Sequence, residues 1–362
     1  MQIAWVVLLS VLVLLFLIQL AFYILPAVSL KRKSATNNIY AENPGVSVII
    51  ACHNELENIK NNLQYVANQK YAKFEIVIVD DNSDDGTAEY ADSISGEFQN
   101  IRVFHNKSRG KKSALTLGIE NATFDRLLFI DADCRPSSQM WISGMMSHFD
   151  EENPLVIGYG ELSGKSFAAR FSAYDADLIA MQYSGFAKLG HPYMAVGRNL
   201  AYSRKIWKKV GGFGSHSDLR SGDDDLFVKE ATLHSKANVC VSPEAKTISP
   251  AKDTFSALLR QKSRHVSTSA RYSFVDKFLS GGEIVSRTLF FAMAVALAFF
   301  SWKIVVVLVA ARLIMIFASF AIFKNETKCL SKLPMLLVFD IFAPFFYIVL
   351  LFYKLFNGQS EW

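Results

Sequence analysis

Paired cysteines are absent from this 362-residue sequence, which has only four cysteines, scattered and without a CxxC spacing: Cys52, Cys134, Cys240 and Cys329. A disulfide framework or a structural zinc site is therefore not expected, and a reducing compartment suits the chain. Basic stripes with interleaved aromatics are also absent from the middle of the chain. The net charge of +5 consequently indicates affinity for a membrane surface, and no nucleic-acid partner is expected.

Charged residues are missing from the first 30 positions. About 20 helical residues cross a bilayer core of about 30 Å, so residues 1–30 are long enough to span it. A cleaved signal peptide is the alternative, but the segment has no basic start, its apolar core is long and no small-x-small cleavage site follows it. We therefore expect a retained amino-terminal transmembrane anchor.

The carboxyl-terminal region, residues 284–355, predicts about three more membrane helices. Its apolar segments of spanning length, or nearly so, are 284–301, 304–323 and 334–353. Arg312 and Asp340 fall inside two of these segments, and ionisable groups at that depth are costly and usually paired or functional. We expect them to pair across antiparallel helices; the alternative is that Arg312 meets a lipid phosphate.

Basic residues predict the orientation of these spans. Lys31, Arg32 and Lys33 follow the first span, and further lysines separate the last two. Cytoplasmic loops carry an excess of Lys and Arg. Both clusters lie in the cytosol if the two termini lie outside and the middle region is cytosolic, so we expect a multi-pass protein of the cell membrane.

The middle region, residues 44–250, alternates β-branched runs such as 46–51 and 74–81 with segments of helical spacing. This order predicts an α/β domain, Rossmann-like, with a mainly parallel sheet and helices on both faces. In such sheets ligands bind beyond the carboxyl ends of the strands. The polar motifs "ACHNE", "VDDNSDDG", "NKSRGKK" and "DAD" each follow a predicted strand, which places them at that edge.

The "DAD" motif sets two carboxylates, Asp131 and Asp133, one residue apart after a buried strand. Two close carboxylates both ionise readily only beside a cation. Hard divalent ions take oxygen ligands, and Mg²⁺ commonly combines one or two carboxylates with substrate phosphates. The alternative is a simple strand-end turn, in which aspartate is favoured without any metal.

Several motifs in a fixed order favour the metal-binding interpretation of "DAD" over the simple turn. They are "VSVIIACHNELENI", "FEIVIVDDNSDDGT", "RGKKSALTLGI", "FIDADCRP", "GRNLAYSRKIWKKVGGF", "SGDDDL" and "QKSRH". Together, over roughly residues 44–272, they resemble glycosyltransferase family 2, and the flanking spans resemble its membrane-embedded members. The resemblance implies a cytosolic catalytic domain of GT-A fold that uses a nucleotide diphosphate sugar and Mg²⁺ or Mn²⁺.

The resemblance also implies roles for the donor-binding residues. By matching position, the base and ribose of the nucleotide would be held by Ala51, His53, Glu55 and Asp81. His53 stands where relatives often have tyrosine, so it stacks on the base or is an ordinary polar loop residue. Lys111 would meet the diphosphate. Asp131 and Asp133 would hold the metal and, through it, the diphosphate.

The run "SGDDDLFVKE" would supply the base that takes a proton from the acceptor hydroxyl. The family pattern places this aspartate three residues before a leucine, and counting back from Leu226 selects Asp223. Gly222 stands where a preceding acid is usual, so Asp224 stays open as the base. The alternative to both is an acidic helix terminus stabilised by the helix dipole.

The segment "LLRQKSRH" resembles the QxxRW motif of the family at Gln261 and Arg264, with His265 in place of the tryptophan. The resemblance implies contacts with the diphosphate and the acceptor. The loss of a large stacking face counts against a processive polymerase. The surrounding residues, 251–280, also predict an amphipathic helix at the membrane interface.

The sequence thus predicts an inverting glycosyltransferase whose acceptor is lipid-linked or a cell-surface glycan. Three alternatives stay open: transfer to a polyprenyl phosphate, a processive polysaccharide synthase, and a non-catalytic subunit that binds a nucleotide sugar. A nucleotidyltransferase fits the residues after 195 less well. The sugar, the oligomeric state and the choice between Mg²⁺ and Mn²⁺ are not determined by these motifs.

Overall fold

A computed structural model describes residues 2–31, 44–219 and 221–357. The chain forms two compact units. The sheet unit comprises Lys33–Gly164 and Gly190–Ala251, and the helical unit comprises Met1–Arg32, Lys165–Leu189 and Lys252–Trp362. Arg32 and Lys33, on which the predicted orientation partly depends, lie outside the described residues.

A seven-stranded sheet is the centre of the sheet unit, with strand order β3-β2-β1-β4-β8-β6-β9. All neighbouring pairs are parallel except those made by β8, which runs antiparallel to β4 and β6. The mainly parallel sheet predicted from the sequence is thereby confirmed. The strands are β1 (Val46–Cys52), β2 (Phe74–Asp80), β3 (Ile101–His105), β4 (Arg126–Phe129), β6 (Leu155–Gly158), β8 (Leu200–Ser203) and β9 (Asn238–Cys240).

Helices cover both faces of this sheet. One face packs against α2 (Leu56–Ala67), α3 (Thr87–Ser95) and α5 (Trp141–Met146), through buried apolar side chains in one cluster. The other face meets α4 (Lys111–Asn121), where Gly118 permits a close approach: a Cβ there would lie 2.9 Å from Ile49 Cγ2. The apolar runs of β1 and β2 are continuous because both of their faces are buried.

Two short helices of the sheet unit are α7 (Arg204–Lys209), which follows β8 at the edge where β4 begins, and α8 (Asp225–Ala231). A second, three-stranded sheet has the order β5-β10-β7, with β5 (Arg135–Pro136) antiparallel to β10 (Thr247–Pro250). β7 (Gly160–Ser163) pairs with the other edge of β10 in parallel. This small sheet begins two residues after Asp133.

The helical unit contains five helices: α1 (Gln2–Leu30), α6 (Phe167–Lys188), α9 (Phe255–Thr268), α10 (Phe274–Thr327) and α11 (Leu336–Asn357). Three of them, α1, α10 and α11, are long and apolar enough to cross a membrane. α6 packs closely on α1, since a Cβ at Gly185 would lie 2.2 Å from Pro26 Cβ. Ser29 Oγ also donates to the Gly185 carbonyl at 3.0 Å.

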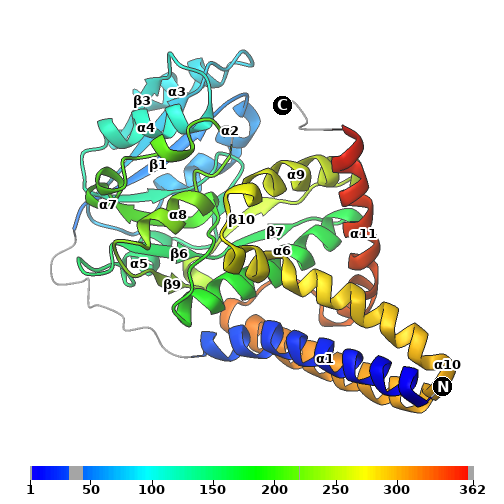
Figure 1. Cartoon of the computed structure of the whole chain (residues 1–362). Helices are drawn as coiled ribbons and strands as arrows, with labels where there is room; N and C mark the ends of the chain where they lie inside the picture. The colour runs from blue at the N-terminus through cyan, green and yellow to red at the C-terminus, as the bar shows by residue number, and fades with distance from the viewer. Residues whose placement is uncertain (1, 32–43, 220, 358–362) are drawn as a thin grey trace. The chain divides into compact units, whose positions relative to one another are not determined.

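α10 consists of two arms, because Ser301 has non-helical backbone angles. The guanidinium of Arg312 in the second arm lies 5.0 Å from the ring centroid of Phe291 in the first. In a straight helix these residues would be about 31 Å apart, so the arms fold back on each other, as Figure 1 shows. The first arm begins at Phe274, ten residues before the predicted span.

Buried charges join the arms of α10 to α11. Arg312 forms a bidentate pair with Asp340, so the pairing predicted from the sequence is confirmed. Asp340 also lies 3.4 Å from Arg287, whose second partner is Glu283 at 2.7 Å. Tyr23 of α1 donates to Glu283 at 3.0 Å. Two cations and two anions thus neutralise each other inside the helical unit, as apolar surroundings require.

Candidate active site

The polar motifs meet at the carboxyl ends of the parallel strands. β1 ends one residue before His53, β2 ends one residue before Asp81, and β4 ends two residues before Asp131. Because these three strands are parallel neighbours, their ends lie on one edge of the sheet. The turn after β4 is closed by a bond from the Cys134 amide to the Asp131 carbonyl, 3.0 Å long.

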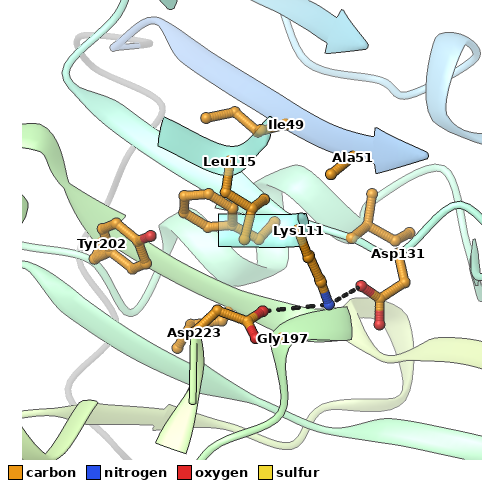
Figure 2. Close-up of a pocket in the computed structure, with 11 residues that line it drawn as sticks. Ile49, Ala51, Lys111, Leu115, Asp131, Gly197, Tyr202 and Asp223 are labelled. Carbon is orange, nitrogen blue, oxygen red and sulfur yellow. Dashed lines mark hydrogen bonds and ion pairs between the residues drawn. The ribbon is translucent and has the colours of Figure 1, made fainter. Parts of the chain in front are cut away.

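Lys111 brings two of the predicted acidic residues together. Its ammonium lies 2.8 Å from Asp131 Oδ1 and 3.2 Å from Asp223 Oδ2 (Figure 2). The lysine stands at the start of α4, after Gly110 with a φ of 118°. Burial by itself would lower the pKa of Lys111, but the carboxylates of Asp131 and Asp223 outweigh burial and raise that pKa well above its ordinary value. A permanent cation therefore joins "DAD" to "DDD".

The space around this cation is small. A cavity of about 10 Å³ is lined by Lys111, Asp131 and Asp223, with Ala51 and Tyr202 among its other walls. That volume is room for roughly one water molecule.

The residues after β4 offer ligands suited to a hard cation. One ligand atom each from Asp131, Asp133 and Cys134 lies within 4.8 Å of the others. Burial, with the negative charges of Asp133 and Asp131, raises the pKa of the Cys134 thiol well above its ordinary value. The thiol therefore stays protonated, and the donor set is two carboxylates, which fits Mg²⁺ or Mn²⁺ better than a soft metal.

The two open choices for the base have different surroundings. Both carboxylate oxygens of Asp224 accept backbone hydrogen bonds, from Gly197 at 2.9 Å and from Asp225 at 2.8 Å. Asp224 thus caps α8 and ties it to the "GRNL" turn. Burial, then the charges of Asp223 and Asp225, raise the pKa of Asp224 to about 7. Asp223 instead faces the cavity, where a substrate proton could reach it.

Lys112 has a role that the sequence analysis did not assign. Its ammonium donates to the carbonyls of His216 at 2.5 Å and Leu219 at 3.0 Å. Both carbonyls belong to the loop that leads into Asp223. Consecutive lysines of α4 therefore hold the same segment, Lys111 by a carboxylate and Lys112 by the backbone. The only signal in the sequence was the doubled lysine itself.

The expected nucleotide-binding residues lie around the ends of β1 and β2. His53 Nδ1 is 2.7 Å from the Asp81 carbonyl, which can only accept, so this nitrogen carries a proton. Glu55 precedes α2 and accepts from Asn58 at 2.5 Å. Asp81 is buried and accepts from Asn106 at 2.7 Å and from the Gly110 amide at 2.9 Å. Asp81 therefore also fixes the loop that presents Lys111.

The residues of the QxxR segment belong to the helical unit. Gln261, Arg264 and His265 lie on α9. Lys262, beside them, forms an ion pair with the buried Asp175 of α6. Tyr347 of α11 donates to the same carboxylate at 2.9 Å. These contacts hold α9 against the other helices of its unit.

Comparison with known proteins relates residues 47–211 to a known family. Residues 47–211 match the family model described as glycosyl transferase family 2. Glycosyltransferase AglE of Haloferax volcanii is 32% identical over 192 residues, which are 52% of this chain and 62% of that protein. Poly-beta-1,6-N-acetyl-D-glucosamine synthase of Staphylococcus aureus is 39% identical over 105 residues, 29% of this chain and 25% of the synthase. The chain thus spans less than two thirds of either relative.

A solved structure resembles the chain over nearly its whole length. The mannosyltransferase PcManGT from Pyrobaculum calidifontis, in complex with GDP-Man and Mn²⁺, aligns with a TM-score of 0.62 and 17% identity. The alignment covers 98% of this chain and 99% of that one. At this identity the likeness establishes the fold. Residues 47–211 thus match the glycosyl transferase family 2 model and share the fold of that mannosyltransferase, GT-A, in a chain that also has three helices long and apolar enough to cross a membrane.

Proposed function

We propose that the protein is a membrane-bound, inverting glycosyltransferase. It transfers a sugar from a nucleotide diphosphate sugar to a lipid-linked or cell-surface glycan at the cytosolic face of the cell membrane. The observation that carries this proposal is the meeting of Asp131, Lys111 and Asp223 at the carboxyl edge of the sheet of a family 2 domain. The apolar helices of the helical unit support the membrane location.

Asp223 acts as the base in this proposal. Its carboxylate takes the proton of the acceptor hydroxyl while that oxygen forms a bond to the anomeric carbon of the donor. The bond from the anomeric carbon to the diphosphate breaks on the opposite face, through an oxocarbenium-like transition state. One such displacement inverts the anomeric centre, and no second carboxylate is needed as a nucleophile. Asp224, with both oxygens occupied by backbone amides, positions α8 instead.

Lys111 and the two aspartates of "DAD" serve the leaving group. When the donor binds, the Lys111 ammonium turns from the carboxylates to the diphosphate, whose negative charge grows as the sugar departs. Asp131 and Asp133 are the residues that would hold Mg²⁺ or Mn²⁺, and the ion would supply Lewis-acid stabilisation of the nucleoside diphosphate. The Mn²⁺ and GDP-Man bound by the similarly folded mannosyltransferase support a metal and a nucleotide sugar as partners.

The remaining predicted residues extend the site in this proposal. His53, Glu55, Asp81 and Ala51 surround the base and ribose of the nucleotide. Gln261, Arg264 and His265 of α9 take the roles that the family resemblance implies, toward the diphosphate and the acceptor.

The test is release of nucleoside diphosphate by the purified, detergent-solubilised protein. A panel of nucleotide sugars is supplied with Mg²⁺, with Mn²⁺ or with a chelator, and membrane lipid extract is the acceptor. We expect release with one donor, dependent on metal and lost in Asp133→Ala and Asp223→Asn. Asp92→Asn is the matched control, because it removes an exposed carboxylate of α3 and leaves release intact.

Other outcomes identify the alternatives. Donor-specific binding without release, unchanged in both variants, would show a non-catalytic nucleotide-sugar-binding subunit. Release that needs polyprenyl phosphate and falls only modestly in Asp223→Asn would show transfer to an acceptor that is already anionic. Long products in the same assay would show a processive polysaccharide synthase.

A further inference from the structure

A groove of about 410 Å³ lies in the sheet unit beside the "DAD" motif. Its walls come from α2, from β5 and from the turn that follows β5, and they include Gln64, Tyr65, Asn68, Arg135, Ser137 and Gln139. The volume is within the usual range for small-ligand sites, about 300–1,000 Å³. Arg135 is two residues from Asp133, so at most about 7 Å of backbone separates the groove from the proposed metal ligands.

Among the described residues, Arg135 is the only charged side chain that lines this groove. Its guanidinium lies 5.2 Å from the ring centroid of Tyr65, and Nη1 donates to the Tyr65 hydroxyl at 3.3 Å. Within the described part of the chain Arg135 has no carboxylate partner. The planar guanidinium carries its N–H groups in a rigid fork, the geometry that binds a carboxylate or a phosphate.

The uncharged walls of the groove suit sugar hydroxyls. The side-chain amides of Gln64, Asn68 and Gln139 make no hydrogen bond to the described residues, so each offers both a donor and an acceptor. The hydroxyl proton of Ser137 is already given to the Pro243 carbonyl at 2.6 Å. Its oxygen is therefore an acceptor for a ligand O–H.

The walls are fixed before any ligand arrives. Gln69, which is buried, donates to the Tyr65 carbonyl at 2.9 Å and to the Ser138 carbonyl at 2.8 Å, and so ties α2 to the turn. Ser138 Oγ donates to the Glu244 carbonyl at 2.8 Å. Arg135 lies opposite Ile248 in the register of β5 and β10. A preorganised site loses less conformational entropy on binding.

We propose that this groove, here called the Arg135 groove, binds an anionic saccharide: a sugar unit whose carboxylate or phosphate pairs with Arg135 while its hydroxyls meet the amides and Ser137. The inference rests on the proposed function, since it makes the acceptor an acidic glycan. Carboxylate and phosphate share the chemistry that Arg135 recognises, and the experiment separates them.

The experiment is calorimetric titration of the full-length, detergent-solubilised protein with three oligosaccharides of equal length. One carries glucuronic acid, one carries glucose 6-phosphate units and one is neutral glucose. We expect one acidic oligosaccharide to bind about tenfold or more tightly than the neutral one, because a bidentate charge-assisted pair forms only with it. Whichever acidic oligosaccharide binds identifies the anionic group.

Variants locate the binding. Arg135→Gln removes the preference for the acidic oligosaccharide, and Tyr65→Ala weakens its binding; both residues are exposed, so folding is preserved. Lys236→Gln, which removes an exposed cation elsewhere in the sheet unit, is the matched control and changes nothing. Equal binding of acidic and neutral oligosaccharides, or an acidic preference that survives Arg135→Gln, overturns the proposal.

Donor hydrolysis in the same preparations separates this inference from the proposed function. Arg135→Gln leaves the metal-dependent release of nucleoside diphosphate to water unchanged, because Arg135 has no part in donor chemistry. Release without any acidic preference refutes the groove alone. An acidic preference that depends on Arg135, in a protein that releases no nucleoside diphosphate from any nucleotide sugar even with the lipid extract supplied, supports the groove and refutes the glycosyltransferase proposal.

Discussion

Replacing Arg312 tests the buried ion pairs of the helical unit. Arg312 is 1% exposed and Asp340 is fully buried. Removal of one partner of a buried pair costs about 3–5 kcal/mol, and without Arg312 the buried Asp340 keeps only the longer contact with Arg287 at 3.4 Å. At roughly 2 °C per kcal/mol for a chain of this size, Arg312→Met lowers the midpoint of thermal unfolding by roughly 6–10 °C.

The geometry predicts how double variants behave. Arg312→Met with Asp340→Leu removes both charges and leaves Arg287 paired with Glu283 at 2.7 Å. This double variant loses less stability than the sum of the single losses, by about 0.5–3 kcal/mol. Exchanging the charges, by Arg312→Asp with Asp340→Arg, places a new cation near Arg287, which now lies 3.4 Å from Asp340. The exchange therefore restores less than the neutral pair.

The assay is thermal unfolding in detergent, followed by the intrinsic fluorescence of the purified variants. Lys303→Met is the control, because it removes an exposed cation of the same helix and should change the midpoint little. Losses that simply add in the neutral double variant would refute the coupling, as would an exchange that restores full stability.

Three further predictions concern the sheet unit. Lys112→Met lowers kcat roughly tenfold, with little change in donor KM, because the loop before Asp223 is held less firmly. Lys112→Arg keeps the positive charge and restores most of the rate. Equal losses of kcat in both variants would contradict a positioning role for Lys112. Glu75→Gln makes the free energy of unfolding fall less steeply below about pH 4.5. Burial would raise the pKa of Glu75, but hydrogen bonds from Ser47, Thr123 and Arg102 outweigh burial and lower that pKa. The parent protein therefore loses the stabilisation from ionised Glu75 as pH falls through that pKa, and chemical denaturation at several pH values measures the difference. Asp224→Asn gains stability relative to the parent protein as pH rises from about 4 to about 7, and the gain stops above pH 7. The reason is that the pKa of Asp224 is about 7 in the native state, above its value in the unfolded state, so the parent loses stability over this pH range. A stability difference independent of pH would contradict that pKa.

The sequence predicted the sheet well because its signals are local. The continuous apolar runs of β1 and β2 indicate strands buried on both faces, and the polar motifs follow these strands directly. The ends of elements were less predictable. The apolar run that begins at Arg126 continues to Ile130, but β4 ends at Phe129, and the Cys134 amide bonds back to the Asp131 carbonyl where the chain turns.

Contacts between distant segments could not be predicted from the sequence. α6 groups with the membrane helices because of Gly185 and Pro26, which nothing local connects. The tether from Lys112 to the carbonyls of His216 and Leu219 spans about a hundred residues. Arg135 has no signal of its own, because its importance depends on Tyr65 and on the amides that folding brings beside it.

The most direct test of the central claim compares Asp223→Asn with Asp224→Asn in a single-turnover transfer assay, with the donor and acceptor that support release by the parent protein. We expect Asp223→Asn to slow the chemical step by roughly 10²-fold or more, as loss of a general base does, while donor affinity is kept. We expect a smaller effect for Asp224→Asn, whose single amide oxygen can still accept one of the two backbone hydrogen bonds of Asp224. A larger loss in Asp224→Asn, or an unchanged rate in Asp223→Asn, would contradict the assignment of the base.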